Sequence, residues 1–182
     1  MAIVIGIGAT SCSTTRHTTK RAEYERSHSN RRDRSKTEKS GEKDKNDLSK
    51  HLKGDEKKII HEAQTWIGTP YKYAHQEKGK ASDCSGFVMK VFEEALELKL
   101  PRNSAKQAEF CKKIRRRDVK PGDLVFFATG KDPNAVSHVG IMVDETNFLH
   151  VSSSKGCVLS NIESNYYAQR LLLFGRVPDM KH

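Results

Sequence analysis

The residue types needed to cleave an amide bond occur together in this 182-residue sequence. Cys84 lies in the run Asp83-Cys84-Ser85-Gly86, at the start of a segment whose apolar residues have helical spacing. A cysteine in the first turn of a helix faces backbone N–H groups and the positive end of the helix dipole, so we expect a lowered thiol pKa. His138 and His150 follow downstream. A cysteine, a histidine base and a group that orients the base form the arrangement of a cysteine hydrolase.

For each of these residues, a purely structural role is the alternative to a catalytic one. A free cysteine is often a buried structural thiol, but Cys84 lies at the predicted helix start and not on the apolar face. A single histidine on a strand is usually structural, whereas His138 has a second inward-facing histidine and a cysteine to act with. We therefore expect Cys84 to be the nucleophile, His138 the general base, and His150 the residue that fixes the tautomer of His138.

Two kinds of segment must position these side chains. Helical spacing predicts a helix over residues 55–67 and a second over residues 84–98, and Ser104-Ala105-Lys106-Gln107 predicts the capped start of a short third helix. After Val119 the pattern favours strands. The predicted strands cover residues 124–127, 139–143, 148–152, 157–159 and 171–177. Helices followed by antiparallel strands indicate an α+β fold.

The alternation in residues 138–152 predicts where the histidines lie. The apolar residues of the two strands must share one face, which places His138 and His150 together on the other face. This register sets Gly140 opposite His150 and leaves room for an imidazole. It requires an odd number of turn residues, or a bulge, near residues 144–147. His150 is then diagonal to His138 and within side-chain reach.

The N-terminal region has a different composition. Residues 1–9 form a short apolar run that ends at Thr10-Ser11-Cys12, the pattern of a bacterial lipoprotein signal in which Cys12 becomes the lipidated first residue. No Lys or Arg precedes the run, so two alternatives stay open: the true start lies upstream of Met1, or the run is a buried strand with a chance cysteine. The run is too short to span a bilayer. We expect residues 1–12 to be a signal peptide with its lipidation cysteine.

Residues 13–58 contain few side chains that can form a core, so we expect a disordered polar tether before a folded domain at residues 59–182. The net charge of the chain is +10, and this segment holds fifteen Lys/Arg and nine Asp/Glu. Such a segment can bind nucleic acid, but Tyr24 is its single aromatic residue, so we expect no nucleic-acid partner. The four cysteines lack zinc-site spacing, and Cys111 and Cys157 are expected to be free, partly buried thiols.

Several short motifs, which follow one another over about residues 60–177, resemble those of a known protein family. They are Ile67-Gly68-Thr69-Pro70-Tyr71, Asp83-Cys84-Ser85-Gly86-Phe87-Val88, Leu100-Pro101-Arg102-Asn103-Ser104, Pro121-Gly122-Asp123-Leu124-Val125-Phe126-Phe127, His138-Val139-Gly140-Ile141 and Phe148-Leu149-His150. With these motifs the chain resembles the NlpC-type cell-wall cysteine peptidases, a papain-like group. The resemblance implies a papain-like α+β fold whose catalytic triad is Cys84, His138 and His150.

The resemblance also implies roles near the triad. Tyr71 would lie beside the thiolate and shape the oxyanion site, together with the backbone N–H of Cys84 or Ser85. Asp83 would receive a substrate ammonium group, and the pocket would be lined or supported by Arg102 and Ser104. The chain departs from the family at Ala74-His75, where two glycines are common. Bulkier residues there would reshape the cleft.

The implied activity is hydrolysis of peptidoglycan stem peptides, between D-γ-glutamyl and a diamino acid or at a nearby crosslink bond, without metal or cofactor. The implied location is the bacterial cell envelope, with a lipid anchor at Cys12 in the outer membrane, facing the periplasm. We expect a monomer. Two alternatives stay open: a catalytically silent module that binds wall peptides, and an amidase or acyltransferase with the same Cys-His chemistry.

Overall fold

The computed structural model describes Ala2 and residues 47–180. The predicted signal peptide, Cys12 and most of the predicted tether lie outside the described residues. The compact unit begins at Asp47, and Leu48 and Leu52 pack against its core. This compact unit thus includes twelve residues before residue 59, the predicted start of the folded domain, and its two leucines supply apolar surface that packs on the core. In the described part of the chain no helix is long and apolar enough to cross a membrane.

The helices follow from apolar spacing and from their caps. Helix α2, Gly54–Gln64, buries Ile59, Ile60 and Ala63 and carries acidic residues in its first turn. Helix α3, Cys84–Leu96, presents one apolar face to the core, as predicted, and ends two residues before its predicted end. Helix α4, Ser104–Phe110, is capped by the side chain of Asn103. The predicted cap at Ser104 is therefore displaced by one residue, because the Asn103 carboxamide reaches the first free N–H groups.

Six strands form one antiparallel sheet in the order β3-β8-β4-β5-β6-β7. Their bounds are Lys112–Ile114 (β3), Leu124–Phe127 (β4), His138–Met142 (β5), Asn147–Ser152 (β6), Gly156–Asn161 (β7) and Leu171–Arg176 (β8). A separate two-stranded pair is formed by Gln76–Glu77 (β1) and Ala81–Ser82 (β2). The short elements η1, Arg116–Asp118, and α5, Asn165–Ala168, complete the fold. The predicted α+β class is confirmed.

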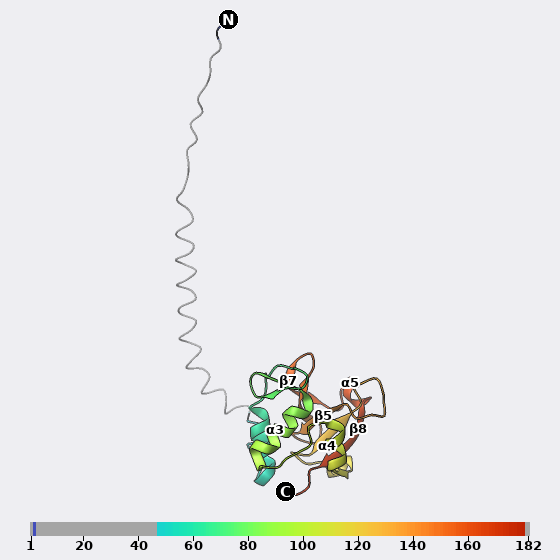
Figure 1. Ribbon diagram of the computed structural model, residues 1–182. Helices are drawn as coiled ribbons and strands as arrows, with labels where there is room; N and C mark the ends of the chain where they lie inside the picture. The colour runs from blue at the N-terminus through green and yellow to red at the C-terminus, as the bar shows by residue number, and fades with distance from the viewer. Residues whose placement is uncertain (1, 3–46, 181–182) are drawn as a thin grey trace. The chain divides into compact units, whose positions relative to one another are not determined.

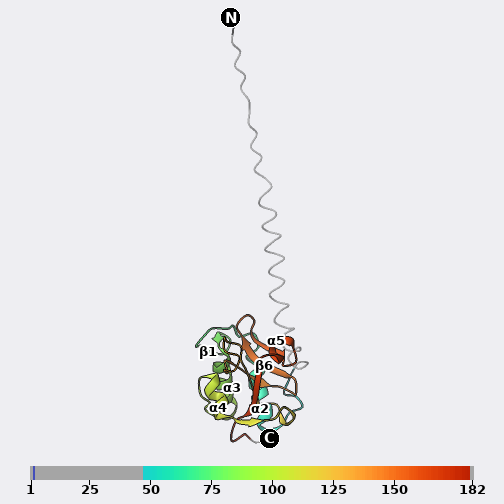
Figure 2. The same cartoon turned by 90° about the vertical axis from the view of Figure 1, so that its right-hand side faces the viewer.

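The sheet separates two apolar clusters. Figures 1 and 2 show the helices and strands that carry them. On one face α3 packs against β5, β6 and α2, and the inward residues of the strands include Val139, Ile141 and Leu149. On the other face Phe127 and Phe148 pack against Tyr167 of α5. Burial on both faces explains why β4 is apolar at every position.

The hairpin of β5 and β6 has the predicted register. Ile141 pairs with Leu149 and Met142 with Phe148, so five residues, an odd number as required, lie between the last paired residues of the hairpin. The carboxylate of Asp144 accepts backbone N–H groups from within the loop and closes it. Continuing this register places Gly140 opposite His150, and a Cβ added at Gly140 would lie 3.2 Å from the Cβ of His150.

Candidate active site

One cleft of about 490 Å³ brings together the side chains that the sequence pointed to. Cys84 enters it from the first turn of α3, His138 from the start of β5 and His150 from the middle of β6. Tyr71 also lines it, with 38% of its surface exposed. The remaining lining residues are Thr129, Ser137, Val151, Ser152, Ser153, Ser154, Lys155, Val158, Ser160, Tyr166 and Tyr167.

Asp83 organises the start of α3. One carboxylate oxygen accepts the backbone N–H of Gly86 at 2.8 Å, and the other accepts the N–H of Ala74 at 2.8 Å. The guanidinium of Arg102 donates to both oxygens. Burial alone would raise the pKa of this carboxyl, but the hydrogen bonds from Arg102 and Gly86 outweigh it and the pKa is lowered. Asp83 is therefore a charged helix cap that holds Cys84 at a fixed point of the cleft.

The thiol of Cys84 does not have the lowered pKa predicted from its helix position. Protein atoms surround the sulfur, although part of the residue stays open to the cleft. Burial, followed by the negative charge of Asp83, raises the pKa to about 11. The backbone N–H groups of Val139, Ser85 and Cys84 itself act in the opposite direction but are weaker. The cleft therefore holds a neutral Cys84 thiol at pH 7.

The two imidazoles form a direct relay. The Nε2 atom of His138 lies 2.9 Å from Nδ1 of His150, so Nδ1 of His138 is the nitrogen available as a base. His150 is fully buried and its ring stacks on Phe148. Burial lowers the pKa of His138 to about 4. Burial, and then the charge of His138, lowers the pKa of His150 to about 3. Both imidazoles are neutral at pH 7, so His138 can accept a proton.

Two hydroxyl groups extend this relay, and neither was predicted as part of the site. The Nε2 atom of His150 lies 2.9 Å from Oγ of Ser160 and 3.1 Å from the phenol oxygen of Tyr167. For His138 to present a free Nδ1 lone pair, its Nε2–H must donate to His150, and His150 must then donate from Nε2. Ser160 and Tyr167 are placed to accept that proton.

Strand alternation could have predicted the position of Ser160. Ser160 of β7 pairs with Phe148 of β6, and it lies two residues along β7 from the residue that pairs with His150. Because side chains two residues apart on a strand share a face, Ser160 lies on the face of the histidines. Tyr167 lies in α5, a helix of four residues whose pattern is too short to predict. No sequence feature indicated that Tyr167 returns to this cleft.

The loop before α3 contacts the helix closely at Ala74-His75, where the sequence departs from the family pattern. Ala74 has a backbone φ of 60°, a left-handed conformation that glycine adopts more readily. The backbone oxygen of His75 accepts the N–H of Asp83, and a Cβ on Gly86 would approach that oxygen to 2.6 Å. Gly86 is therefore required for close packing between the loop and the first turn of α3.

The predicted substrate-contacting residues lie beside the cleft and not in its lining. Asp83 and Ser104 are buried, and Arg102 is committed to Asp83 and to the hydroxyl of Ser85 at 2.9 Å. A role for these residues toward substrate stays a prediction. Tyr71 lies near the thiol as expected, and burial, followed by the charges of Cys84 and Asp83, raises its pKa.

The other described cysteines take no part in the cleft. Cys111 and Cys157 are buried free thiols in the main core, and burial raises the pKa of each to about 12. Among residues 47–180 no group of three His, Cys, Asp or Glu side chains is arranged to hold a metal ion.

Comparison with curated proteins identifies relatives of this domain. A "Probable endopeptidase" of Haemophilus influenzae is 43% identical over 104 residues, which are 57% of this chain and 63% of that protein. The murein DD-endopeptidase/murein LD-carboxypeptidase of Escherichia coli K12 is 35% identical over 113 residues, which are 62% of this chain and 58% of that protein. The chain thus spans less than two thirds of the length of these relatives.

A solved structure has the same architecture. The NLP/P60 family protein of Staphylococcus aureus Mu50, described as similar to lipoprotein, matches with a TM-score of 0.61 and 28% identity. The match covers 68% of this chain and 41% of that protein. The family model for NlpC/P60 matches residues 68–176, which contain the helix start, both histidines and both hydroxyls of the relay. This chain therefore belongs to the NlpC/P60 family.

Proposed function

We propose that this protein is a cysteine endopeptidase that hydrolyses an amide bond of peptidoglycan stem peptides. The observation that carries the proposal is the cleft in which Cys84, at a helix start, meets a buried relay of His138 and His150. Family membership and the names of the endopeptidase relatives support the substrate class.

The chemistry begins from two neutral groups. Nδ1 of His138 takes the proton of the Cys84 thiol as the sulfur attacks the amide carbonyl. The tetrahedral oxyanion is stabilised by the backbone N–H of Cys84 or Ser85, with the Tyr71 hydroxyl beside it. Protonated His138 then gives its proton to the departing amine and leaves a thioester, which water hydrolyses with His138 again as base.

Two bonds are candidates for cleavage. The motif resemblance favours the bond between D-γ-glutamyl and a diamino acid, and the name of the E. coli relative favours a DD crosslink between stem peptides. The first cut releases a fragment with a new amino-terminal diamino acid. The second separates crosslinked muropeptides without shortening either stem. Mass analysis of the released fragments distinguishes the two bonds, and it also distinguishes hydrolysis from acyl transfer.

The test is digestion of purified sacculi by the protein and by Cys84→Ala. Wild-type protein is expected to release muropeptides, and the variant is expected to release none while keeping its melting temperature. Release of the same fragments by Cys84→Ala would refute the proposal. Retention of sacculi by both proteins, with no fragments from either, would establish the binding module instead.

We propose further that residues 1–12 are a lipoprotein signal, that Cys12 carries the lipid, and that the protein is held in the bacterial cell envelope. The likeness of Met1–Ala9 and Thr10-Ser11-Cys12 to such signals supports this. The tether is then residues 13–46, up to the start of the compact unit. Metabolic labelling with a fatty acid that is lost in Cys12→Ala would support the anchor, and unchanged labelling would refute it.

A further inference from the structure

The positive charge of the folded part is concentrated in one short segment. Residues 112–120 hold six Lys/Arg and one Asp, a net charge of +5. Residues 47–180 as a whole hold 21 Lys/Arg and 17 Asp/Glu, a net charge of +4. Outside this segment the described domain is therefore slightly acidic. A charge distribution this uneven creates a localised field that attracts anions to one place.

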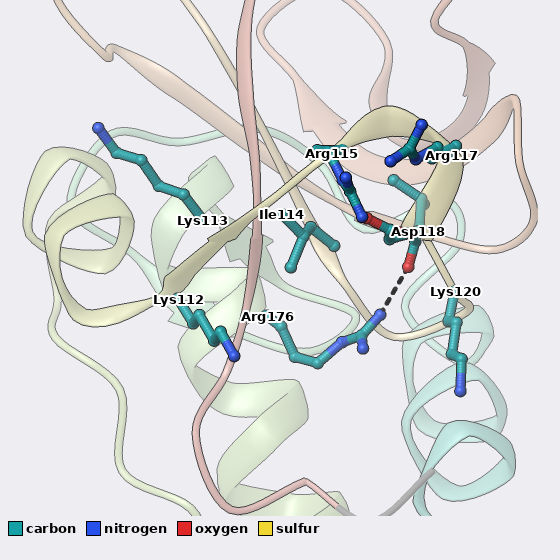
Figure 3. Close-up of a pocket in the computed structure, with 9 residues that line it drawn as sticks. Lys112, Lys113, Ile114, Arg115, Arg117, Asp118, Lys120 and Arg176 are labelled. Atoms are coloured by element: carbon teal, nitrogen blue, oxygen red, sulfur yellow. Dashed lines mark hydrogen bonds and ion pairs between the residues drawn. The ribbon is translucent and has the colours of Figure 1, made fainter.

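These residues line a groove of about 650 Å³, which we call the basic groove. Its lining consists of Lys112, Lys113, Ile114, Arg115, Arg117, Asp118, Val119, Lys120 and Arg176. Figure 3 shows the Arg176 side chain between those of Lys112 and Lys120 in this view. Arg176 is fixed there, because its guanidinium donates to both oxygens of buried Asp123 and to the backbone carbonyl of Asp118.

Most of the cationic groups around this fixed centre have no carboxylate partner. Arg115 pairs with Asp118 at 2.7 Å. Lys112, Lys113, Arg117 and Lys120 form no ion pair within residues 47–180. All four are exposed. Such a cluster repels itself unless an anion occupies it, and surface groups of this kind are available for a ligand at little desolvation cost.

Protection of a sheet edge explains part of this cluster. Strand β3 is an edge strand, and lysines on such a strand block pairing with another chain. This accounts for Lys112 and Lys113. It does not account for Arg117 and Lys120, which lie beyond the strand and line the same groove.

The position of the basic groove leaves the cleft free. The groove lies at the β3 edge of the sheet, whereas the cleft is lined by β6 and β7 at the opposite edge. Four strand-to-strand steps separate β3 from β6, about 20 Å at the usual strand spacing. A surface held at the groove would therefore not cover Cys84.

We propose that the basic groove docks this domain on the phosphate headgroups of an anionic lipid bilayer. Lysines near an anionic leaflet contribute about 1 kcal/mol each to binding. The groove has no aromatic side chain in its lining, which disfavours single-stranded nucleic acid, whose bases stack on such residues. The choice of a lipid surface rests on the proposed function in the cell envelope.

The test measures vesicle binding by the full chain with Cys12→Ala in every protein, so that no acyl chain contributes. The groove variant is Lys112→Gln/Lys120→Gln. The matched control is Lys50→Gln/Lys99→Gln, which removes the same charge at two exposed lysines outside the groove. Partition is measured by sedimentation with vesicles of phosphatidylglycerol and phosphatidylcholine, and with phosphatidylcholine alone.

The parent is expected to bind only the anionic vesicles. The groove variant should lose about 25-fold in partition, since each of its two lysines contributes about fivefold, while the control loses less than about twofold. An equal loss in both variants, or no loss in either, overturns the proposal. Groove-dependent binding of polyphosphate or double-stranded DNA without vesicle binding overturns it too.

A Cys84→Ala protein that binds vesicles but releases no muropeptides from sacculi shows that docking does not need catalysis. Lysine-dependent vesicle binding by a protein that cuts no sacculi would refute the proposed function and leave docking intact.

Discussion

Removing the two hydroxyls behind His150 tests the relay without touching the nucleophile or the base. Ser160→Ala and Tyr167→Phe each delete one oxygen within hydrogen-bonding distance of Nε2 of His150 and keep the rest of the side chain. The double variant deletes both. His150 is fully buried in the wild-type structure, and these two hydroxyls are the side-chain partners of its Nε2 among residues 47–180.

The expected magnitudes follow from the number of acceptors that remain. Each single variant leaves one hydroxyl, and the loss of one hydrogen bond of about 1 kcal/mol lowers kcat/KM about fivefold. In the double variant the Nε2–H of His150 has no acceptor. The pair then favours the tautomer in which His150 donates to His138, which leaves a hydrogen on Nδ1 of His138 and blocks the base. We expect a loss of about 100-fold or more, beyond the product of the single effects, since a wrong tautomer in a comparable triad costs on the order of 10⁴.

The assay is kcat/KM on a purified stem peptide, with melting temperature measured in parallel. Tyr73→Phe is the matched control, because Tyr73 is 79% exposed and lies outside the cleft lining. It should change kcat/KM less than about twofold. Imidazole ¹⁵N chemical shifts report the tautomer of His150 directly and are expected to change only in the double variant. A double variant within about threefold of wild type, or one with an unchanged tautomer, would refute the relay.

Three further predictions concern the helix start. Gly86→Ala places a Cβ 2.6 Å from the His75 carbonyl oxygen, so the free energy of unfolding from urea titration should fall by about 1–3 kcal/mol; an unchanged value would contradict the packing. Alkylation of Cys84 by iodoacetamide should stay slow at pH 7 and accelerate toward a midpoint near pH 11, and a midpoint below pH 7 would contradict the raised pKa. Arg102→Met should lower stability by about 2 kcal/mol at pH 7. Because the pKa of Asp83 is lowered below its ordinary 3.8, this difference should shrink as the pH falls below about 4, and a difference independent of pH would contradict the pairing.

The histidine hairpin was predictable because a strand has a period of two. Once the apolar residues of β5 and β6 are required to share a face, the relation between His138 and His150 and the odd loop follow. The observed contact of 2.9 Å between the rings confirms that inference. The same reasoning, extended one strand, reaches Ser160 through its pairing with Phe148.

Other features of the site depend on contacts that sequence periodicity does not encode. The position of Tyr167 depends on a four-residue helix and on the packing of the Tyr167 ring against Phe127 and Phe148. The partners of Asp83 come from a loop nine residues earlier and from Arg102, nineteen residues later. The local pattern placed Asp83 next to the cysteine, but it did not predict that one carboxylate oxygen caps the helix while the other binds the N–H of Ala74 in the preceding loop.

The thiol pKa shows why position on a helix is insufficient to predict reactivity. The helix start and the N–H of Val139 favour a thiolate, but burial and the nearby carboxylate of Asp83 oppose it more strongly. Burial also keeps His138 neutral. Cys84 and His138 therefore form no thiolate–imidazolium ion pair before substrate binds. In the mechanism that we propose, the N–H groups around the sulfur and the relay behind His138 stabilise charge as it forms during attack. Such stabilisation lowers the barrier because it is absent from the resting state.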